Sequence, residues 1–193
     1  AVVGAGPAGI SFSITAAQRG HVVSLFEESN EIGGQLNFAK MIPGKEEFHG
    51  LLNYYKNEIK RLKIDLITDH KVKTTDLINF DEIIISTGVV ARKIDIEGQD
   101  KVNFVYDYQE VFNDRVKLGN RIAIIGAGGI GFDVAEYISS SGISPTLDIN
   151  KWMEKWGVTD PSIERGGVLQ KNEIRSEDSS KEIFLLQRKN EKV

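Results

Sequence analysis

The hydrophobic positions at the start of the chain form short apolar runs separated by helix-like segments. An apolar run at Ala1–Val3 leads through glycines into Ile10–Arg19, a stretch of small and apolar residues typical of a helix, and Gly20 is a typical helix stop. His21–Glu27 is apolar again and predicts a buried strand. A strand, a helix and a second strand in this order make up a βαβ unit.

A longer helical pattern and three short strands are expected next. The helix is amphipathic over about Lys45–Leu62, with apolar positions at helical spacing. The strands are predicted at Ile64–Thr68, at Lys71–Val72 and at Glu82–Ser86. These elements complete a first unit over residues 1–88.

The same pattern recurs in the second half of the chain. A buried strand at Arg121–Ile125 leads through a second group of glycines into a helix that ends at about Ser139, and a last strand is predicted at Glu182–Leu186. We therefore expect an α/β fold with two Rossmann-like, glutathione-reductase-like dinucleotide-binding units in tandem. The expected parts are a first unit at residues 1–88, a polar crossover at 89–119, and a second unit at 120–193 with a polar insertion at about 140–181.

Both units look incomplete at the level of sequence. The first strand has only three residues before its glycine turn, and a Rossmann sheet usually has further strands beyond its second. We expect the chain to be part of a larger polypeptide, or to complete its sheets with partners. In the insertion, Trp152 and Trp156 are spaced as on one helix face, and we expect them to pack locally.

The composition is that of an ordinary globular protein and excludes several kinds of function. The 193 residues are 40% hydrophobic and 27% charged, and the net charge of −4 leaves no basic field for nucleic acid or an anionic membrane. There is no cysteine, and therefore no disulfide framework, cysteine nucleophile or ligand set for an iron–sulfur cluster in this sequence. His21, His49 and His70 lack a metal-binding spacing, and we expect no metal site. No apolar run approaches the roughly 20 residues of a bilayer span, and we expect a cytoplasmic protein.

The first glycine turn has the spacing of a dinucleotide-binding site. Gly4 permits a sharp turn, Gly6 removes the side chain that would block a pyrophosphate, and Gly9 lets the helix lie against the strand. The amide groups of residues 7–9 and the positive end of the helix dipole then face the anion. Glu27 ends the second strand, where a carboxylate accepts hydrogen bonds from both ribose hydroxyls and repels a 2′-phosphate. The alternative is a tight turn with a solvated glutamate.

Three further features favour FAD as the nucleotide of the first unit. In FAD domains the long cofactor runs past the turn, and a Gly-Gly loop lets the backbone approach the flavin side. The features are Pro7-Ala8 inside the turn, Gly33-Gly34-Gln35 shortly after the acidic residue, and Thr87-Gly88 after a later strand.

The second glycine turn predicts a different nucleotide. Gly126, Gly128 and Gly131 again lie between a strand and a helix, but no acidic residue follows at the usual distance. The next strand arrives only after the insertion, and Arg188 and Lys189 follow it. Two cations at this position pair with a 2′-phosphate, which favours NADPH over NADH. A solvated basic pair is the alternative.

Four segments carry a resemblance to a known family, and two of them, Ile42–Lys45 and the insertion segment Glu154–Gly157, are more specific than any glycine motif. The four segments are Ile42–Phe48, Gly126–Asp133, Glu154–Gly157 and Leu186–Lys189. Through them the chain resembles, from end to end, the bacterial NADPH-dependent 2,4-dienoyl-CoA reductases, a family in the old-yellow-enzyme and trimethylamine-dehydrogenase group of flavoproteins. In this family an N-terminal barrel carries FMN, the catalytic residues and a four-iron four-sulfur cluster, and the C-terminal half carries FAD and the NADPH site. The resemblance implies that this chain is part of that C-terminal half.

The resemblance also implies cofactor contacts and a reaction. FAD contacts fall on Ala8 in the turn, Glu27 at the ribose, Gln35 and Lys45 along the flavin side, and Val72 near the adenine, and the NADPH 2′-phosphate falls on Arg188 and Lys189. NADPH reduces FAD, and electrons pass through the cluster to FMN, which reduces 2,4-dienoyl-CoA in the β-oxidation of unsaturated fatty acids. The implied partners are NADPH and the barrel of the same polypeptide. This chain receives no catalytic residue and is expected to be inactive on dienoyl-CoA by itself.

Two other interpretations remain open. The chain could come from another tandem flavoprotein, such as an amine dehydrogenase or the small subunit of glutamate synthase. Arg188 and Lys189 favour a pyridine-nucleotide donor over the amine dehydrogenases, and the insertion with Trp152 and Trp156 is not expected in glutamate synthase. The chain could also be a non-catalytic nucleotide-binding module. A flavin bleached by NADPH would indicate the enzyme, and a colourless protein that retains ADP would indicate the module.

Overall fold

The computed structural model describes residues 1–92, 94–113, 116–169 and 181–188. The chain forms two compact units. One consists of Ala1–Lys40 and Glu47–Ile94, and the other consists of Met41–Glu46 and Asp95–Val193. In the described part of the chain, no helix is long and apolar enough to cross a membrane.

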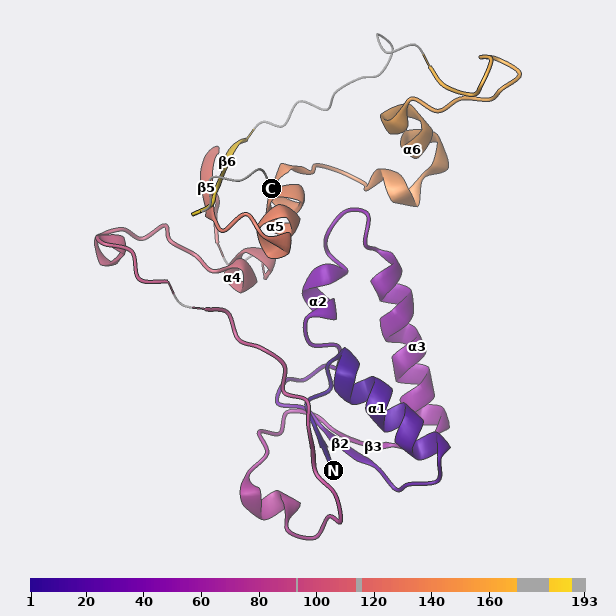
Figure 1. Ribbon diagram of the computed structural model, residues 1–193, viewed down its shortest axis with the longest axis vertical. Helices are drawn as coiled ribbons and strands as arrows, with labels where there is room; N and C mark the ends of the chain where they lie inside the picture. The colour runs from indigo at the N-terminus through magenta and orange to yellow at the C-terminus, as the bar shows by residue number, and fades with distance from the viewer. Residues whose placement is uncertain (93, 114–115, 170–180, 189–193) are drawn as a thin grey trace. The chain divides into compact units, whose positions relative to one another are not determined.

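The first unit contains a parallel four-stranded sheet with helices between its strands (Figure 1). The strand order is β3-β2-β1-β4, and each neighbouring pair is parallel. The strands are β1 (Val2–Val3), β2 (Ser24–Phe26), β3 (Asp65–Ile67) and β4 (Ile84–Ile85). The helices are α1 (Pro7–Gln18), α2 (Leu36–Ala39), α3 (Glu47–Arg61) and the 3₁₀ helix η1 (Thr74–Leu77). The predicted βαβ start is confirmed.

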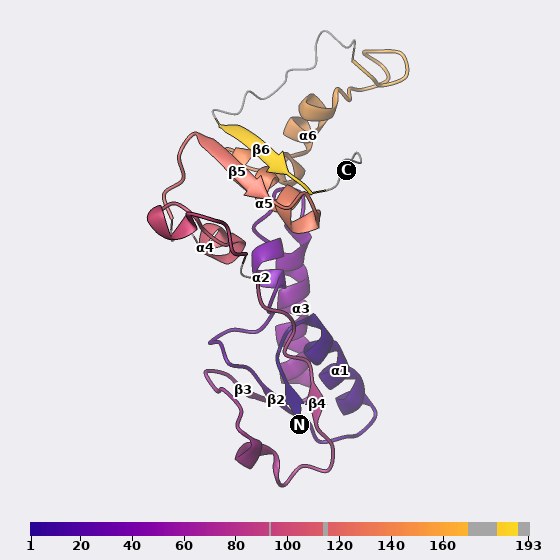
Figure 2. The same ribbon diagram turned by 60° about the vertical axis from the view of Figure 1, so that its left-hand side comes forward.

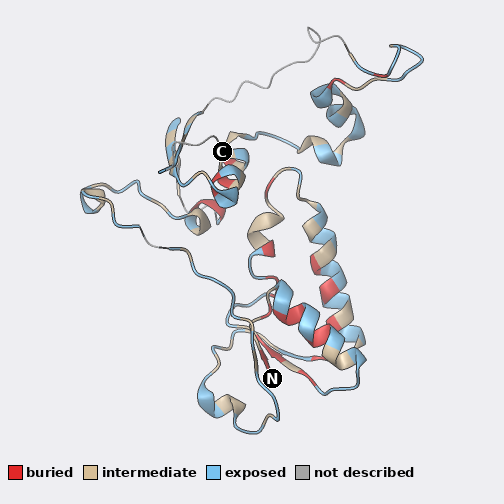
Figure 3. Cartoon of the chain, viewed as in Figure 1, coloured by how far each residue is buried: buried red, intermediate tan, exposed pale blue. Residues whose placement is uncertain are grey.

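The core of the first unit lies where α1 packs against the sheet and against α3 (Figure 3). Ile10 and Ile14 of α1, Leu52 and Ile59 of α3, and Leu25 of β2 are all buried there. The apolar positions of α3 repeat at helical spacing, so one stripe of the helix is buried while the remaining face stays polar. This packing fixes the amino end of α1 beside the end of β1.

The predicted strand at Lys71–Val72 is wrong. Asp69 adopts a left-handed φ of 54°, which turns the chain away from β3, and η1 begins at Thr74. Between these points the Lys71 ammonium forms an ion pair of 3.0 Å with Glu28. The segment is therefore a loop that lies close to the end of β2.

The second unit contains a two-stranded parallel sheet next to a helix (Figure 2). β5 (Arg121–Ile125) pairs with β6 (Glu182–Leu186) along its whole length, with Arg121 opposite Glu182. The glycine turn after β5 leads into α5 (Gly129–Ser139). These three elements confirm the sequence prediction. The shorter elements are η2 (Gln99–Lys101), α4 (Tyr108–Phe112), η3 (Pro145–Leu147) and α6 (Ile149–Trp156).

Side chains of α4 and α5 form a small core in the second unit. Val111 and Phe112 of α4 and Val134 and Ile138 of α5 are buried, and the ring of Tyr137 lies 4.8 Å from that of Phe112. This contact packs α4 against α5, and the amino end of α5 directly follows the glycine turn.

The tryptophans of α6 pack against each other as expected. The ring centroids of Trp152 and Trp156 are 6.4 Å apart. No residue of α6 is buried, and the helix is instead defined locally, by the Asp148 side chain at its start and by Gly157 in the left-handed region at its end.

Candidate dinucleotide-binding sites

The first glycine turn has the close backbone packing that a dinucleotide site requires. Gly4 has a φ of 102°, and a Cβ atom there would collide with the carbonyl oxygen of Ser86. A Cβ atom on Gly9 would collide with the carbonyl oxygen of Gly4. At Gly6, by contrast, a Cβ atom would meet nothing within 4 Å. The turn is thus tight on the side of the sheet and open at Gly6, as a cradle for a pyrophosphate should be.

The amino end of α1 presents backbone donors at this open position. Gly6 is the N-cap residue and no side chain caps the helix. Pro7 carries no N–H, so it supplies none of the donors expected from residues 7–9. The N–H groups of Ala8 and Gly9 remain without a hydrogen-bond partner among the described residues. Together with the helix dipole they suit an anion.

Glu27 is bound to the turn itself. Its Oε2 accepts a hydrogen bond of 2.8 Å from the N–H of Ala5, and its Oε1 accepts from the N–H and the hydroxyl of Ser29, each at 2.9 Å. A carboxylate offers about four acceptor positions, so room remains for a ribose hydroxyl. Ser29 was not singled out from the sequence, although a serine two residues after a carboxylate is a common local hydrogen-bonding pattern.

The structure brings the Gly33-Gly34 loop against the first turn. The N–H of Gly33 donates to the carbonyl of Ala5 at 2.8 Å, and a Cβ atom on Gly34 would lie 3.2 Å from the Cα of Gly6. Gly33 has a φ of 121°, which only glycine adopts freely. Gln35 follows as the exposed N-cap residue of α2. The first glycine turn and the Gly33-Gly34 loop, which are both predicted to contact FAD, therefore lie against each other.

The end of β4 lies against the first glycine turn and supports it. The hydroxyl of Ser86 lies 2.9 Å from the carbonyl oxygens of both Val3 and Gly4. Thr87 and Gly88 come next and are exposed, and Gly88 has a φ of 73°. Ser86 was missed from the sequence, because only the pairing of β1 with β4 shows that it faces Gly4.

Two residues predicted for FAD remain, Val72 and Lys45. Val72 is half-buried in the loop between β3 and η1. Lys45 belongs to the second compact unit, where its ammonium lies 2.6 Å from Oδ1 of Asp133 on α5. The structure therefore gives Lys45 a protein partner, and its contact with FAD stays a prediction.

The second turn repeats the geometry of the first. Gly126 has a φ of 113°, and its N–H donates to the carbonyl of Leu186 at 2.8 Å. A Cβ atom on Gly131 would collide with the carbonyl oxygen of Gly126, whereas one on Gly128 would meet nothing within 4 Å. Gly128 is the N-cap residue of α5, again without a capping side chain. Gly131 and Gly128 thus repeat the roles of Gly9 and Gly6, whereas Gly126 shares only the positive φ of Gly4, since a Cβ atom on Gly126 would meet nothing within 4 Å.

Arg188 stands at the carboxyl end of the strand that neighbours this turn. It follows β6 by two residues, is exposed, and has no ion-pair partner within the described residues. Since β5 and β6 are parallel, their carboxyl ends lie at the same edge of the sheet. Lys189, the second predicted cation, lies outside the described residues.

Glu46, a carboxylate of the second unit, has a strongly lowered pKa. Partial burial acts to raise the pKa of Glu46, but hydrogen bonds from Ser144 and Thr146, and from the N–H of Gly44, outweigh it and lower the pKa to about 2. The hydroxyl of Thr146 donates to Oε2 of Glu46 at 2.6 Å. This group is ionised under ordinary conditions and fixes the Met41–Glu46 segment within the unit.

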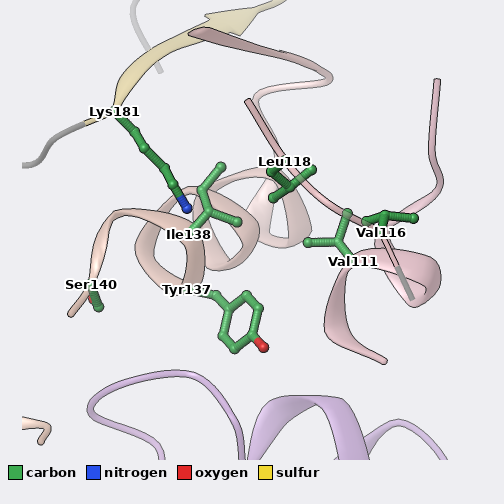
Figure 4. Close-up of a pocket in the computed structure, with 7 residues that line it drawn as sticks. All are labelled: Val111, Val116, Leu118, Tyr137, Ile138, Ser140 and Lys181. Carbon is green, nitrogen blue, oxygen red and sulfur yellow. The ribbon is translucent and has the colours of Figure 1, made fainter. Parts of the chain in front are cut away.

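A separate pocket in the second unit does not belong to the nucleotide site (Figure 4). It has a volume of about 340 Å³, and its lining comes from α4, from the segment between α4 and β5, and from α5, with Lys181 at its edge. Lys181 precedes β6 and Ser140 follows α5, so the pocket lies at the amino end of the strands. The glycine turn follows the carboxyl end of β5, which is the opposite edge.

Comparison with known proteins shows the family to which the chain belongs. Residues 1–164 match the family model described as pyridine nucleotide-disulphide oxidoreductase. The chain belongs to this family. It is an α/β module that binds FAD and NAD(P)H.

The relatives are longer proteins with several activities. The chain is 35% identical over 155 residues to a metal reductase of Desulforamulus reducens, and 34% identical over 143 residues to a bilirubin reductase of Mediterraneibacter gnavus. These matches cover 76% and 73% of this chain, but only 22% of each relative. Among solved structures, a complex of 2-naphthoyl-CoA reductase with 2-naphthoyl-CoA matches with a TM-score of 0.67 at 28% identity, over 80% of this chain and 26% of that one.

Proposed function

We propose that this chain accepts hydride from NADPH onto FAD and so supplies electrons for the reduction of a 2,4-dienoyl-CoA. The observation that supports it best is the pair of glycine turns. Each stands at the amino end of a helix, with open space at Gly6 and at Gly128. A carboxylate, Glu27, accompanies one turn and a guanidinium, Arg188, accompanies the other. Glu27 disfavours a 2′-phosphate on the nucleotide and Arg188 favours one. The first site therefore suits FAD as the bound cofactor, and the second suits NADPH as the diffusing reductant.

In the first unit the residues bind and orient the FAD. The N–H groups of Ala8 and Gly9 face the pyrophosphate, Glu27 accepts from the ribose, and Gly33-Gly34 let the backbone approach the flavin side. Bound FAD supplies the ability to accept a hydride and to release electrons singly. In this proposal no residue of the chain acts as a general acid or base, and the protein contributes position and electrostatics.

In the second unit the proposal assigns NADPH rather than NADH. Gly126, Gly128 and Gly131 receive the pyrophosphate, while Arg188 and Lys189 pair with the 2′-phosphate. The exposure of Arg188 and its lack of an ion-pair partner in the described part of the chain support this role, because the guanidinium is available to a ligand.

The acyl-CoA substrate is supported by two kinds of similarity. The segment Ile42–Phe48 and the ending Leu186–Lys189 resemble the dienoyl-CoA reductases. One structural neighbour is a reductase bound to an aromatic acyl-CoA. The iron–sulfur cluster, the FMN and the barrel that completes the relay belong to the rest of the proposed polypeptide, and we keep the cytoplasm as its proposed location.

The test uses the full polypeptide that carries this chain. Anaerobic mixing with NADPH should reduce the flavin, seen as loss of oxidised flavin absorbance, and NADH should do so far more slowly. Adding a 2,4-dienoyl-CoA should then restore the oxidised spectrum. A protein that binds FAD but is reduced equally by both nucleotides would contradict the NADPH assignment, and reoxidation by other acceptors only would contradict the dienoyl-CoA assignment.

The competing functions give different results in the same experiment. An amine dehydrogenase would be reduced by a methylated amine and not by NADPH. A nucleotide-binding module without catalysis would be colourless after purification, would retain ADP, and would stay unreduced after FAD is added back.

A further inference from the structure

The loop between β3 and η1 lies beside the carboxylate proposed for the ribose. The N–H of His70 donates to the carbonyl of Glu27, and the N–H of Asp69 donates to the carbonyl of Ser29, each at 2.9 Å. Val72, which belongs to the proposed FAD site, follows in the same loop and is half-buried. The loop therefore connects the end of β2 with the proposed adenine contact.

His70, in the loop, contacts Asp76, which lies within η1, and the contact closes the segment of residues 70–76, named loop 70–76. Nε2 of His70 lies 2.9 Å from Oδ2 of Asp76, and the same oxygen accepts the N–H of Lys73 at 2.8 Å. The N–H of Lys73, and after it His70, lower the pKa of Asp76. The carboxylate is therefore ionised near neutral pH and acts as the acceptor, so Nε2 carries the hydrogen. The contact ties the first and last residues of loop 70–76 to each other.

The imidazole is also packed against the sheet. The His70 ring lies 5.8 Å from the ring of Phe26, and Phe80 meets the same phenyl ring edge-on at 5.9 Å. Phe26 is the last residue of β2 and is buried. His70 thus connects the buried end of β2 to the closed loop.

We propose that His70 is a positioning residue for the adenosine end of bound FAD: it holds loop 70–76, and with it Val72, in the shape that receives the adenine. This proposal rests on the proposed FAD site of the first unit. A loop already held in its binding shape loses less conformational entropy when the cofactor binds. Loss of the His70–Asp76 contact therefore weakens binding without removing a group that touches the cofactor.

The test compares two substitutions of His70 with one at a matched position. His70→Leu removes the donor, whereas His70→Gln keeps an N–H at about the position of Nε2. His49→Leu is the control, because His49 is an exposed histidine on α3 of the same unit. The Kd for FAD is measured by titrating the full polypeptide after removal of its FAD, and ADP is measured as a competitor of FAD.

We expect His70→Leu to weaken FAD and ADP by the same factor, about 5- to 10-fold, because the two ligands share the adenosine half. His70→Gln should restore most of the affinity, and His49→Leu should match the wild type. Unchanged FAD affinity in His70→Leu overturns the proposal but leaves the proposed function standing. A wild-type polypeptide that binds no FAD refutes the proposed function itself. A loss for FAD alone, with a lower unfolding temperature of the FAD-free protein, indicates a structural role only and also overturns the proposal.

Discussion

The N–H of Ala5 donates a 2.8 Å hydrogen bond to Oε2 of Glu27, so the acidic residue at the end of β2 is bound to the middle of the first glycine turn. The carboxylate therefore has two tasks in the proposed site. It holds the turn in place and it presents acceptors to a ribose. Removal of the Glu27 carboxylate should therefore loosen the turn and also remove acceptors for the ribose.

Glu27→Ala should weaken FAD binding by about 1–3 kcal/mol, because the ribose hydroxyls of FAD lose an acceptor. Glu27→Gln should lose less, since its amide oxygen still accepts one of these hydrogen bonds. Flavin content of the purified full polypeptide and a titration of the FAD-free form measure the effect. Glu31→Ala, an exposed carboxylate in the same loop, is the control. Equal flavin content in all four proteins would argue against the role of Glu27.

Arg188→Ala combined with Lys189→Ala should weaken NADPH binding by about 2–4 kcal/mol, because two charge-assisted contacts to the 2′-phosphate are lost. NADH has no such phosphate and should bind with unchanged affinity. The Kd of each nucleotide in the full polypeptide separates the two cases. Arg19→Ala, which removes an exposed cation from the first unit, should change neither value. The 2′-phosphate assignment fails if both nucleotides lose affinity equally.

Gly9→Ala should destabilise the chain by about 1–3 kcal/mol, because its Cβ atom would overlap the carbonyl of Gly4. Gly50→Ala is the matched control: Gly50 lies within α3, and a Cβ atom there meets nothing within 4 Å. That substitution should stabilise the helix by about 0.5–1 kcal/mol. Urea unfolding of the two variants gives both free energies. A Gly9→Ala variant as stable as the wild type, or more stable, would show that the first turn has room for a Cβ atom at this position.

Glu46 should make the stability of the second unit depend on pH at the acidic end. Its folded-state pKa, about 2, lies below the ordinary value of 4.5, so the folded state is stabilised above that ordinary value. The stabilisation is lost as the pH falls from about 4.5 towards about 2. In Glu46→Gln the free energy of unfolding should fall less steeply over this interval than in the wild type. Parallel curves would mean that the hydrogen bond from Thr146 does not persist in solution.

The parts of the fold that depend on local pattern were predictable from the sequence. The strand at Arg121–Ile125, the helix ending at Ser139 and the strand at Glu182–Leu186 match the structure, because apolar runs and glycine turns mark them directly. The strand expected at Lys71–Val72 failed because a left-handed Asp69, an unusual backbone conformation for a residue other than glycine, redirects the chain.

Contacts between distant residues were not predictable in this way. Ser86 lies against Gly4 only because β4 pairs with β1, and the Lys45–Asp133 ion pair joins residues from opposite halves of the sequence. A single sequence contains no signal for either pairing. The residues that touch a nucleotide in the proposal follow from motifs, whereas those that hold the motifs in shape follow only from the fold.

Two contacts from later parts of the chain support the first glycine turn: the hydrogen bond from Gly33 to Ala5 and the close packing of Gly4 against Ser86. Both are needed if the turn is to be transferred to another protein. A graft that ended after the second strand would lack both supports, and the grafted loop would have to find substitutes in its new host. An engineer who wishes to move this nucleotide site must carry the Gly-Gly loop and the end of the fourth strand with it.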